Sequence, residues 1–74
     1  MHLNPQFAIG TLVTSLHDNI ILWSDRVDGD TTIERLFYGE VAIVLTKERK
    51  GWVLLISGRG KTGKTRSIDL KFII

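Results

Sequence analysis

The sequence predicts an all-β protein, folded as a small antiparallel barrel of five or six strands. β-branched and aromatic residues recur in short runs that end at glycine, Asp or Asn, as strands separated by tight turns do. No run of ten or more residues has helical periodicity. The length of 74 residues allows one small domain, with residues 1–9 expected as a loose leader and residues 10–74 as the barrel.

Three strands are expected in the first half of the chain. Residues 11–16 and 19–24 are rich in β-forming side chains, and His17-Asp18-Asn19 separates them. A polar segment follows, in which Asp28-Gly29 predicts a turn. Residues 32–38 carry apolar groups on both faces, which indicates a strand that is partly covered on both sides.

The second half begins with two strands joined by a charged hairpin. Residues 41–45 are typical of a fully buried strand, because apolar side chains occupy both of its faces. Lys47-Glu48-Arg49-Lys50-Gly51 is expected to be the hairpin loop, and residues 52–57 the strand after it.

The last part of the chain is expected to begin with a glycine-rich basic loop over residues 58–65. Residues 67–70 predict one turn of 3₁₀ helix, with Ser67 as its N-terminal cap. Residues 71–74 are expected to form a short final strand.

The loop Gly58-Arg59-Gly60-Lys61-Thr62-Gly63-Lys64-Thr65 matches every fixed position of the phosphate-binding pattern G-x-x-x-x-G-K-[ST]. In such loops, backbone N–H groups surround the phosphates and a helix follows, because its N-terminus supplies further N–H groups. Only nine residues follow Thr65, and they have no helical face. We therefore interpret the match as a coincidental hairpin loop and expect no bound nucleotide.

Four segments of the chain resemble the second half of a Src-homology-3-like barrel: residues 39–45, 51–55, 63–70 and 72–73. That family has a Gly-Glu strand, a charged hairpin, a Trp-led strand, a glycine turn, a 3₁₀ turn and a final strand in this order. The resemblance implies that Trp52 faces a ligand. Peptide-binding members also have an aromatic stretch and a Pro-Tyr pair that this chain lacks, so polyproline recognition is not expected.

Two segments are similar to those that frame small barrels encoded by tailed bacteriophages. They are the opening Gly10-Thr11-Leu12-Val13 and the closing Asp69-Leu70-Lys71-Phe72-Ile73. This resemblance implies a small virion component, or an adaptor to a host protein, located in the virion or in the host cytoplasm. Because such barrels serve unrelated roles, the resemblance does not define the partner.

Two function classes follow, and the first is a non-enzymatic protein-binding or assembly module, whose partner is another protein or a second copy of the chain. Its candidate contact residues are large aromatic side chains and the charged hairpin: Trp52, Tyr38, Trp23, Lys47, Arg49 and Lys50. The apolar run around Trp23 favours a core position, whereas core and contact positions are both open for Trp52. Phe37, Tyr38 and Phe72 are expected in the core or at its rim.

The alternative is a nucleic-acid-binding barrel, similar to the KOW type, that uses its basic loops. Its candidate residues are Arg59, Lys61, Lys64 and Arg66. No aromatic side chain lies within the basic loops to stack on bases, so weak binding is expected.

The net charge of +2 divides into −4 for residues 1–40 and +6 for residues 41–74. These halves either form opposite poles of the molecule or intermix in the fold.

No enzyme, cofactor or metal site is expected. Without cysteine there is no disulfide, thiolate zinc site or Cys nucleophile, and His2 and His17 have no metal-ligand spacing. A triad of His17 with Ser15 or Ser24 would need a cleft that a filled small barrel lacks. The apolar runs are far shorter than the roughly 18 residues of a membrane span, and no signal peptide is recognised, so we expect a cytoplasmic protein without membrane contact.

Overall fold

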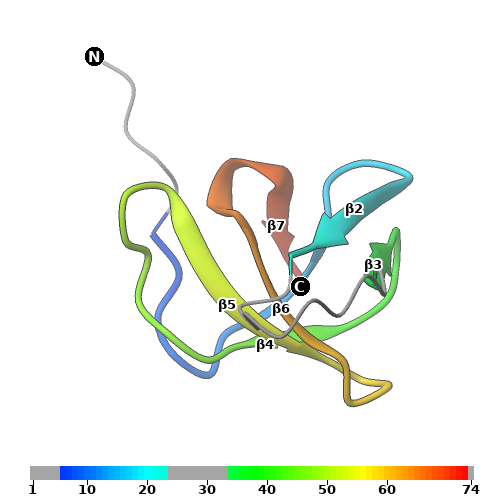
Figure 1. Cartoon of the computed structure of the whole chain (residues 1–74), viewed down its shortest axis with the longest axis horizontal. Helices are drawn as coiled ribbons and strands as arrows, with labels where there is room; N and C mark the ends of the chain where they lie inside the picture. The colour runs from blue at the N-terminus through cyan, green and yellow to red at the C-terminus, as the bar shows by residue number, and fades with distance from the viewer. Residues whose placement is uncertain (1–5, 24–33, 74) are drawn as a thin grey trace.

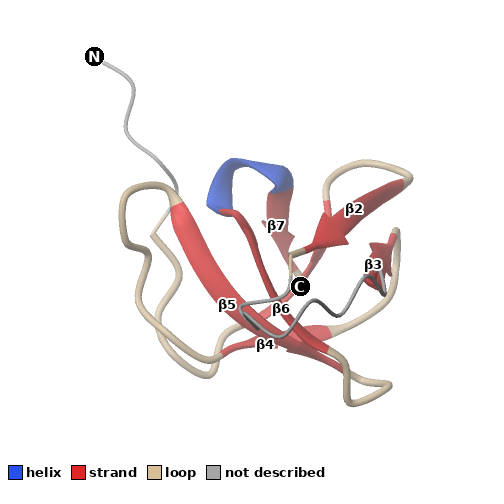
Figure 2. Ribbon diagram, in the orientation of Figure 1, coloured by secondary structure: helices blue, strands red, loops and turns tan. Residues whose placement is uncertain are grey.

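The computed structural model describes residues 6–23 and 34–73, which form seven strands and one short 3₁₀ turn (Figure 1). The strands are β1 (Leu12–Ser15), β2 (Asn19–Leu22), β3 (Glu34–Phe37), β4 (Ala42–Val44), β5 (Trp52–Ser57), β6 (Thr62–Arg66) and β7 (Leu70–Phe72). The 3₁₀ turn, η1 (Ser67–Asp69), lies between β6 and β7. The described part of the chain contains no α-helix, so the predicted all-β class is confirmed (Figure 2).

Five strands form one antiparallel sheet in the order β6-β5-β4-β1-β7, and β2 pairs with β3 in a second, two-stranded sheet. Within residues 6–23 and 34–73, backbone hydrogen bonds join the two sheets at Trp23 and Lys64. Trp23, directly after β2, and Lys64 of β6 each donate an N–H to the carbonyl oxygen of the other, both at 2.8 Å. The β2–β3 pair is therefore attached to the β6 edge of the larger sheet.

One hydrophobic core lies beneath both sheets. In β5 every second residue, from Val53 to Ser57, is buried, and the residues between them are half-buried, as the period-two geometry of a strand requires. The buried apolar side chains are Phe7, Val13, Ile20, Leu22, Leu36, Ala42, Val44, Val53, Leu55 and Leu70.

The expected loose leader contains one of these core residues. Phe7 is only 3 % exposed, and its ring lies 4.7 Å from the ring of Phe72, measured between centroids. The packed unit therefore includes Phe7, which precedes the expected start of the barrel at Gly10. Residues 1–5 lie outside the described part of the chain.

Gly63 of β6 allows β2 and β6 to approach each other closely. A Cβ atom at this position would lie 2.6 Å from the Cβ of Leu22 and 2.8 Å from its carbonyl carbon, which is closer than real Cβ contacts come. The second fixed glycine of the phosphate-loop pattern therefore has a packing role in this fold.

Most predicted strand positions are confirmed, and β5 has the bounds expected for it. The loop predicted over residues 58–65 is wrong in its second half, because residues 62–65 belong to β6 and pair with β5. The turn is confined to residues 58–61, where Gly60 has a positive φ of 80°. The strand expected at 32–38 is described from Glu34 onward, and the turn expected at Asp28-Gly29 lies outside the described residues.

The 3₁₀ turn occurs where it was predicted, but the role expected for Ser67 is wrong. Arg66 is the residue that precedes the turn, and no side chain makes a capping hydrogen bond there. The Ser67 hydroxyl is instead buried, with no hydrogen-bond partner among the described residues.

Candidate functional site

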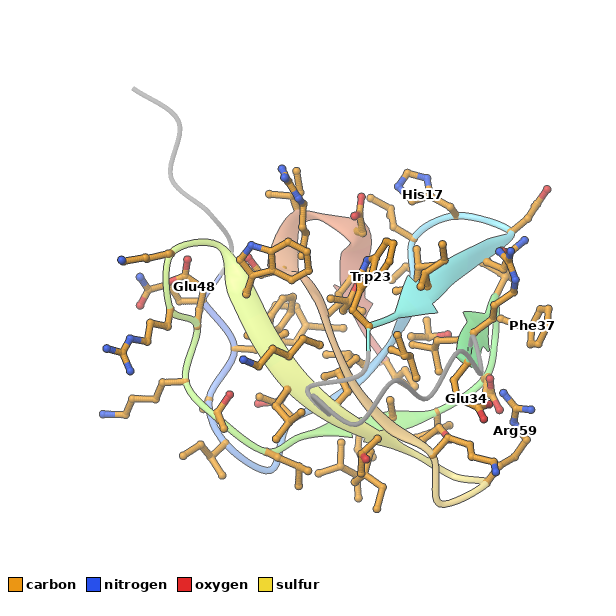
Figure 3. The ribbon with its side chains drawn as sticks, viewed as in Figure 1. His17, Trp23, Glu34, Phe37, Glu48 and Arg59 are labelled. Carbon is orange, nitrogen blue, oxygen red and sulfur yellow. The ribbon has the colours of Figure 1, made fainter. Side chains whose placement is uncertain are left out.

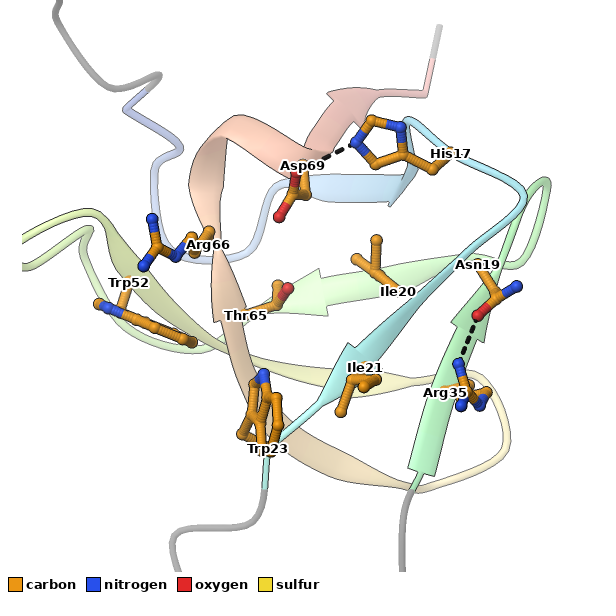
Figure 4. Close-up of a pocket in the computed structure, with 10 residues that line it drawn as sticks. All are labelled: His17, Asn19, Ile20, Ile21, Trp23, Arg35, Trp52, Thr65, Arg66 and Asp69. Atoms are coloured by element: carbon orange, nitrogen blue, oxygen red, sulfur yellow. Dashed lines mark hydrogen bonds and ion pairs between the residues drawn. The ribbon is translucent and has the colours of Figure 1, made fainter.

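Two tryptophans from distant parts of the sequence lie on either side of β6. Trp52 of β5 is paired with Arg66, and Trp23 is bridged to Lys64, two residues earlier on β6. Directly opposed residues of antiparallel strands point to the same face, and so do residues two apart on one strand. Trp52, Arg66, Lys64 and Trp23 therefore share one face, and Figure 4 shows the two indoles flanking β6.

The two tryptophans differ in how they are held. Trp23 is 54 % exposed, while its backbone is fixed by the two hydrogen bonds to Lys64. Trp52 is half-buried, and the Arg66 guanidinium lies 5.4 Å from the centroid of its ring, within cation–π distance. Both rings are thus presented from regular backbone rather than from loop tips.

A surface concavity of about 790 Å³ lies against both tryptophans. The charged residues of its lining are all basic: Lys47, Arg49, Lys50 and Lys64. Thr46, Val53 and Leu54 complete the lining, and none of the described residues that line it is acidic. We call the two tryptophans and these four basic residues the tryptophan surface.

The hairpin loop that carries three of the basic residues is folded back on itself. Arg49 and Trp52 each donate a backbone N–H to the carbonyl oxygen of the other, at 2.8 and 3.0 Å. Lys50 and Gly51, at the tip of the loop, have positive φ angles of 54° and 86°. Of the two residues, glycine adopts such an angle at little cost. The Glu48 carboxylate accepts a hydrogen bond from the Gly51 N–H within the loop, and this bond stabilises the turn.

A second, smaller concavity of about 350 Å³ adjoins the same two tryptophans (Figure 4). Its rim carries two polar side-chain pairs: the His17 imidazole lies 3.0 Å from an Asp69 carboxylate oxygen, and the Arg35 guanidinium donates to the Asn19 side-chain oxygen at 2.7 Å. The two tryptophans lie between the two concavities, since Trp23 and Trp52 line both, whereas Arg66 lines only the smaller one.

The structure brings together most of the residues proposed from sequence, but it regroups them. Five of the six candidate protein contacts form the tryptophan surface, together with Lys64 from the candidate nucleic-acid set: Trp23, Trp52, Lys47, Arg49 and Lys50. Arg66 lies next to them, on Trp52. Tyr38 is 62 % exposed and lies elsewhere, where the Lys71 ammonium stands 4.6 Å from its ring centroid and donates to its hydroxyl at 3.2 Å.

Arg59 and Lys61 are not part of this surface, because each lies beside an acidic residue of the first half of the chain. Arg59 donates to Glu40 through Nε and to the Arg35 carbonyl oxygen, and Lys61 lies 3.7 Å from Glu34. Figure 3 shows Arg59 with Glu34 and Phe37 at one end of the molecule. These pairs favour the intermixed arrangement of the −4 and +6 halves over separate poles.

The pairing of Glu40 also affects its titration. Burial raises the pKa of the Glu40 carboxyl, but hydrogen bonds from the Arg59 side chain and the Phe37 N–H, together with the charge of Arg59, outweigh that effect. The pKa of Glu40 therefore lies below its ordinary value.

One expectation about aromatic residues is wrong. Trp23 was expected in the core, but Leu22 occupies the inward position and Trp23 points outward. Phe37, Tyr38 and Phe72, expected in the core or at its rim, are all exposed, and Phe72 packs against the buried ring of Phe7.

The second half of the phosphate-loop pattern has the geometry of a strand. Its Gly63-Lys64-Thr65 segment pairs with β5, and the Lys64 N–H donates to Trp23 across the strand. The Thr65 side chain is buried, and a short 3₁₀ turn follows instead of a helix. The backbone N–H of Lys64 is thus engaged within the sheets and is not presented to a phosphate.

The catalytic triad considered from the sequence, with His17 and Ser15, is also not formed. The Ser15 hydroxyl is buried, donates to the His17 carbonyl oxygen at 2.8 Å and accepts the His17 N–H at 3.1 Å. The imidazole itself bonds to Asp69. Ser24, the other serine considered, lies outside the described residues.

Over residues 6–23 and 34–73, no group of three or more His, Cys, Asp or Glu side chains is placed to hold a metal ion. In the same residues, no helix has the length and apolar character needed to cross a membrane. Comparison with protein-family models, with curated proteins and with solved structures finds no match to this chain.

Sequence reasoning identified Trp23, Trp52 and the hairpin cations separately but did not place them together. The sequence does not reveal the bridge between Trp23 and Lys64. These two residues lie side by side because the β2–β3 pair is attached to β6. No local pattern marks such a long-range contact. The period-two geometry of a strand was the one available signal, because in a strand over residues 20–23 it assigns Trp23 to the face opposite Leu22.

Proposed function

We propose that the protein is a non-enzymatic binding module, built on a Src-homology-3-like barrel, that acts as an adaptor or assembly component through its tryptophan surface. The observation that carries this proposal is the joint lining of one concavity by two tryptophans and four basic side chains, with no acidic residue among the described lining residues. Tryptophan supplies a large contact area, and a surface of one charge sign favours a partner of the opposite sign. The partner is therefore anionic.

The pairing of the strands supports the barrel. β1 pairs with β4 on one side and with β7 on the other, and β3 packs against β1. The β2–β3 pair is in turn attached to β6, at the far edge of the five-stranded sheet. The strands thus follow one another around the core, and the 3₁₀ turn directly before β7 fits the order of elements that the resemblance implies.

A polyanion of defined charge tests this proposal directly. We expect the protein to be retained on a heparin column and to elute at a lower salt concentration when Lys47 and Lys50 are both replaced by Ala. The matched control is Lys61→Ala with Lys71→Ala, which removes the same charge from positions outside the tryptophan surface. Equal elution of the two double variants would contradict the proposed surface, because only overall charge would then matter.

A further inference from the structure

We propose that the partner of the tryptophan surface is a single-stranded nucleic acid, an inference that rests on the proposed function and specifies its ligand. The surface combines the two features that single-strand binding needs. Basic side chains neutralise the phosphates, and exposed aromatic rings stack on unpaired bases. The basic loops alone contain no aromatic residue, but the fold supplies two from other segments.

Trp23 is the stacking platform. More than half of its side chain is in solvent, although burying such a ring in the core would have been favourable. Its backbone is fixed to Lys64 by two hydrogen bonds of 2.8 Å, so the ring is presented with little loss of backbone freedom on binding. This placement puts an aromatic face directly beside a basic side chain of β6.

Trp52 continues the same surface. It lies across β6 from Trp23, and Arg66 stands over its ring at 5.4 Å from the centroid. A guanidinium on an aromatic ring adds a positive charge next to a second stacking position. Because both tryptophans line the larger and the smaller concavity, a strand can pass from one concavity to the other across the two rings.

The charges fit a phosphate backbone. Lys47, Arg49 and Lys50 extend along the hairpin loop, and Lys64 lies between the two tryptophans. The three hairpin cations predict that the logarithm of the binding constant falls with the logarithm of salt concentration with a slope of about −2.1, since each single-strand contact contributes about −0.7. An acidic peptide satisfies the same charges but offers no bases to stack on Trp23. A duplex offers phosphates but hides the faces of its bases.

The experiment is a titration of intrinsic tryptophan fluorescence with a twelve-residue oligothymidylate, repeated at several salt concentrations. Both tryptophans of the chain belong to the surface, so quenching reports binding there. We expect quenching by the oligonucleotide and a salt slope of about −2.1. Replacing Lys47 and Lys50 by Ala reduces that slope by about 1.4 in magnitude, whereas replacing Lys61 and Lys71 by Ala leaves it unchanged.

Trp23 variants separate stacking from charge. Trp23→Ala is expected to weaken oligonucleotide binding by about fivefold or more, the factor that corresponds to the loss of one stacked base, and Trp23→Phe retains most of the affinity. Trp52 fluorescence remains as the readout in both variants, and circular dichroism confirms that they fold. Poly-L-glutamate of similar charge and a blunt duplex are titrated in parallel.

The outcomes distinguish the inference from the function on which it rests. Binding of polyglutamate or duplex as tight as that of the oligonucleotide, with no effect of Trp23→Ala, would overturn the single-strand assignment and leave an anion-binding module. Absence of quenching by all three polyanions at low salt would overturn both proposals.

Discussion

At the scale of single residues, Trp23 shows why the core could be predicted only in part. It ends an unbroken apolar run, and such a run favours burial along its whole length. In an extended strand, however, neighbouring side chains point to opposite faces, so that Ile20 and Leu22 are buried and Trp23 is exposed. Phe7 is the reverse case, because no strand pattern surrounds it and its burial depends on contact with Phe72.

Gly63 provides a direct test of the contact between β2 and β6. Gly63→Ala should lower the free energy of unfolding by about 1–3 kcal/mol, because the new methyl group would overlap the backbone and Cβ of Leu22. Gly58→Ala is the matched control, since a Cβ there meets only the Val41 carbonyl oxygen at 3.6 Å, and it should change stability by less than about 1 kcal/mol. Urea denaturation of both variants measures the difference, and equal midpoints would contradict the close approach.

The ion pair between Glu40 and Arg59 predicts a pH dependence of stability. The pKa of Glu40 is lowered in the folded protein, so its stabilising effect is present above the pKa of the unfolded chain and is lost as the pH falls through the folded value. Between about pH 6 and pH 3 the wild type should therefore lose more stability than Glu40→Gln, by less than about 1 kcal/mol because Arg59 is half exposed. Urea midpoints at both pH values measure this, and parallel losses in the two proteins would be inconsistent with the pairing.

At the scale of elements, short-range patterns predicted the strands well and the loops less well. The apolar run of β5 and its flanking glycines define its two ends, and the position of η1 was also predicted. The start of β6 was missed because Gly63 and Lys64 have low strand preference, and they are extended because β5 and Trp23 provide hydrogen-bond partners. Tertiary pairing therefore overrides local composition in this element.

The strand geometry of β6 yields a prediction about the phosphate-loop pattern. Lys64→Ala should leave the free energy of unfolding within about 0.5 kcal/mol of the wild type, because the backbone bonds that hold the strand remain. Neither protein should bind ATP with micromolar affinity in a Mg²⁺-dependent way, since the Lys64 N–H is engaged by Trp23. Calorimetric titration with and without Mg²⁺ measures this, and tight, metal-dependent binding by the wild type that Lys64→Ala abolishes would refute the interpretation.

At the scale of the whole molecule, the fold determines which charges are neutralised and which remain together. Arg59 and Lys61 lie beside Glu40 and Glu34, whereas the basic residues of the hairpin loop gather around the tryptophans. The net charges of the two halves of the sequence contain no information about this division, because it depends on which strands become neighbours. The candidate residues were thus predicted from the sequence, but the surface that they form was not.

The measurement that tests this account most directly is a two-dimensional ¹H–¹⁵N NMR titration of the labelled protein with the oligothymidylate at low salt. The chain has only two tryptophans, so each indole N–H gives a signal that can be assigned with one variant. We predict that both indole signals shift together with the backbone amides of residues 47–50, while those of Tyr38 and Lys71 stay in place. Stationary indole signals, or shifts confined to the Tyr38 and Lys71 side of the molecule, would contradict the assignment of the tryptophan surface as the binding site.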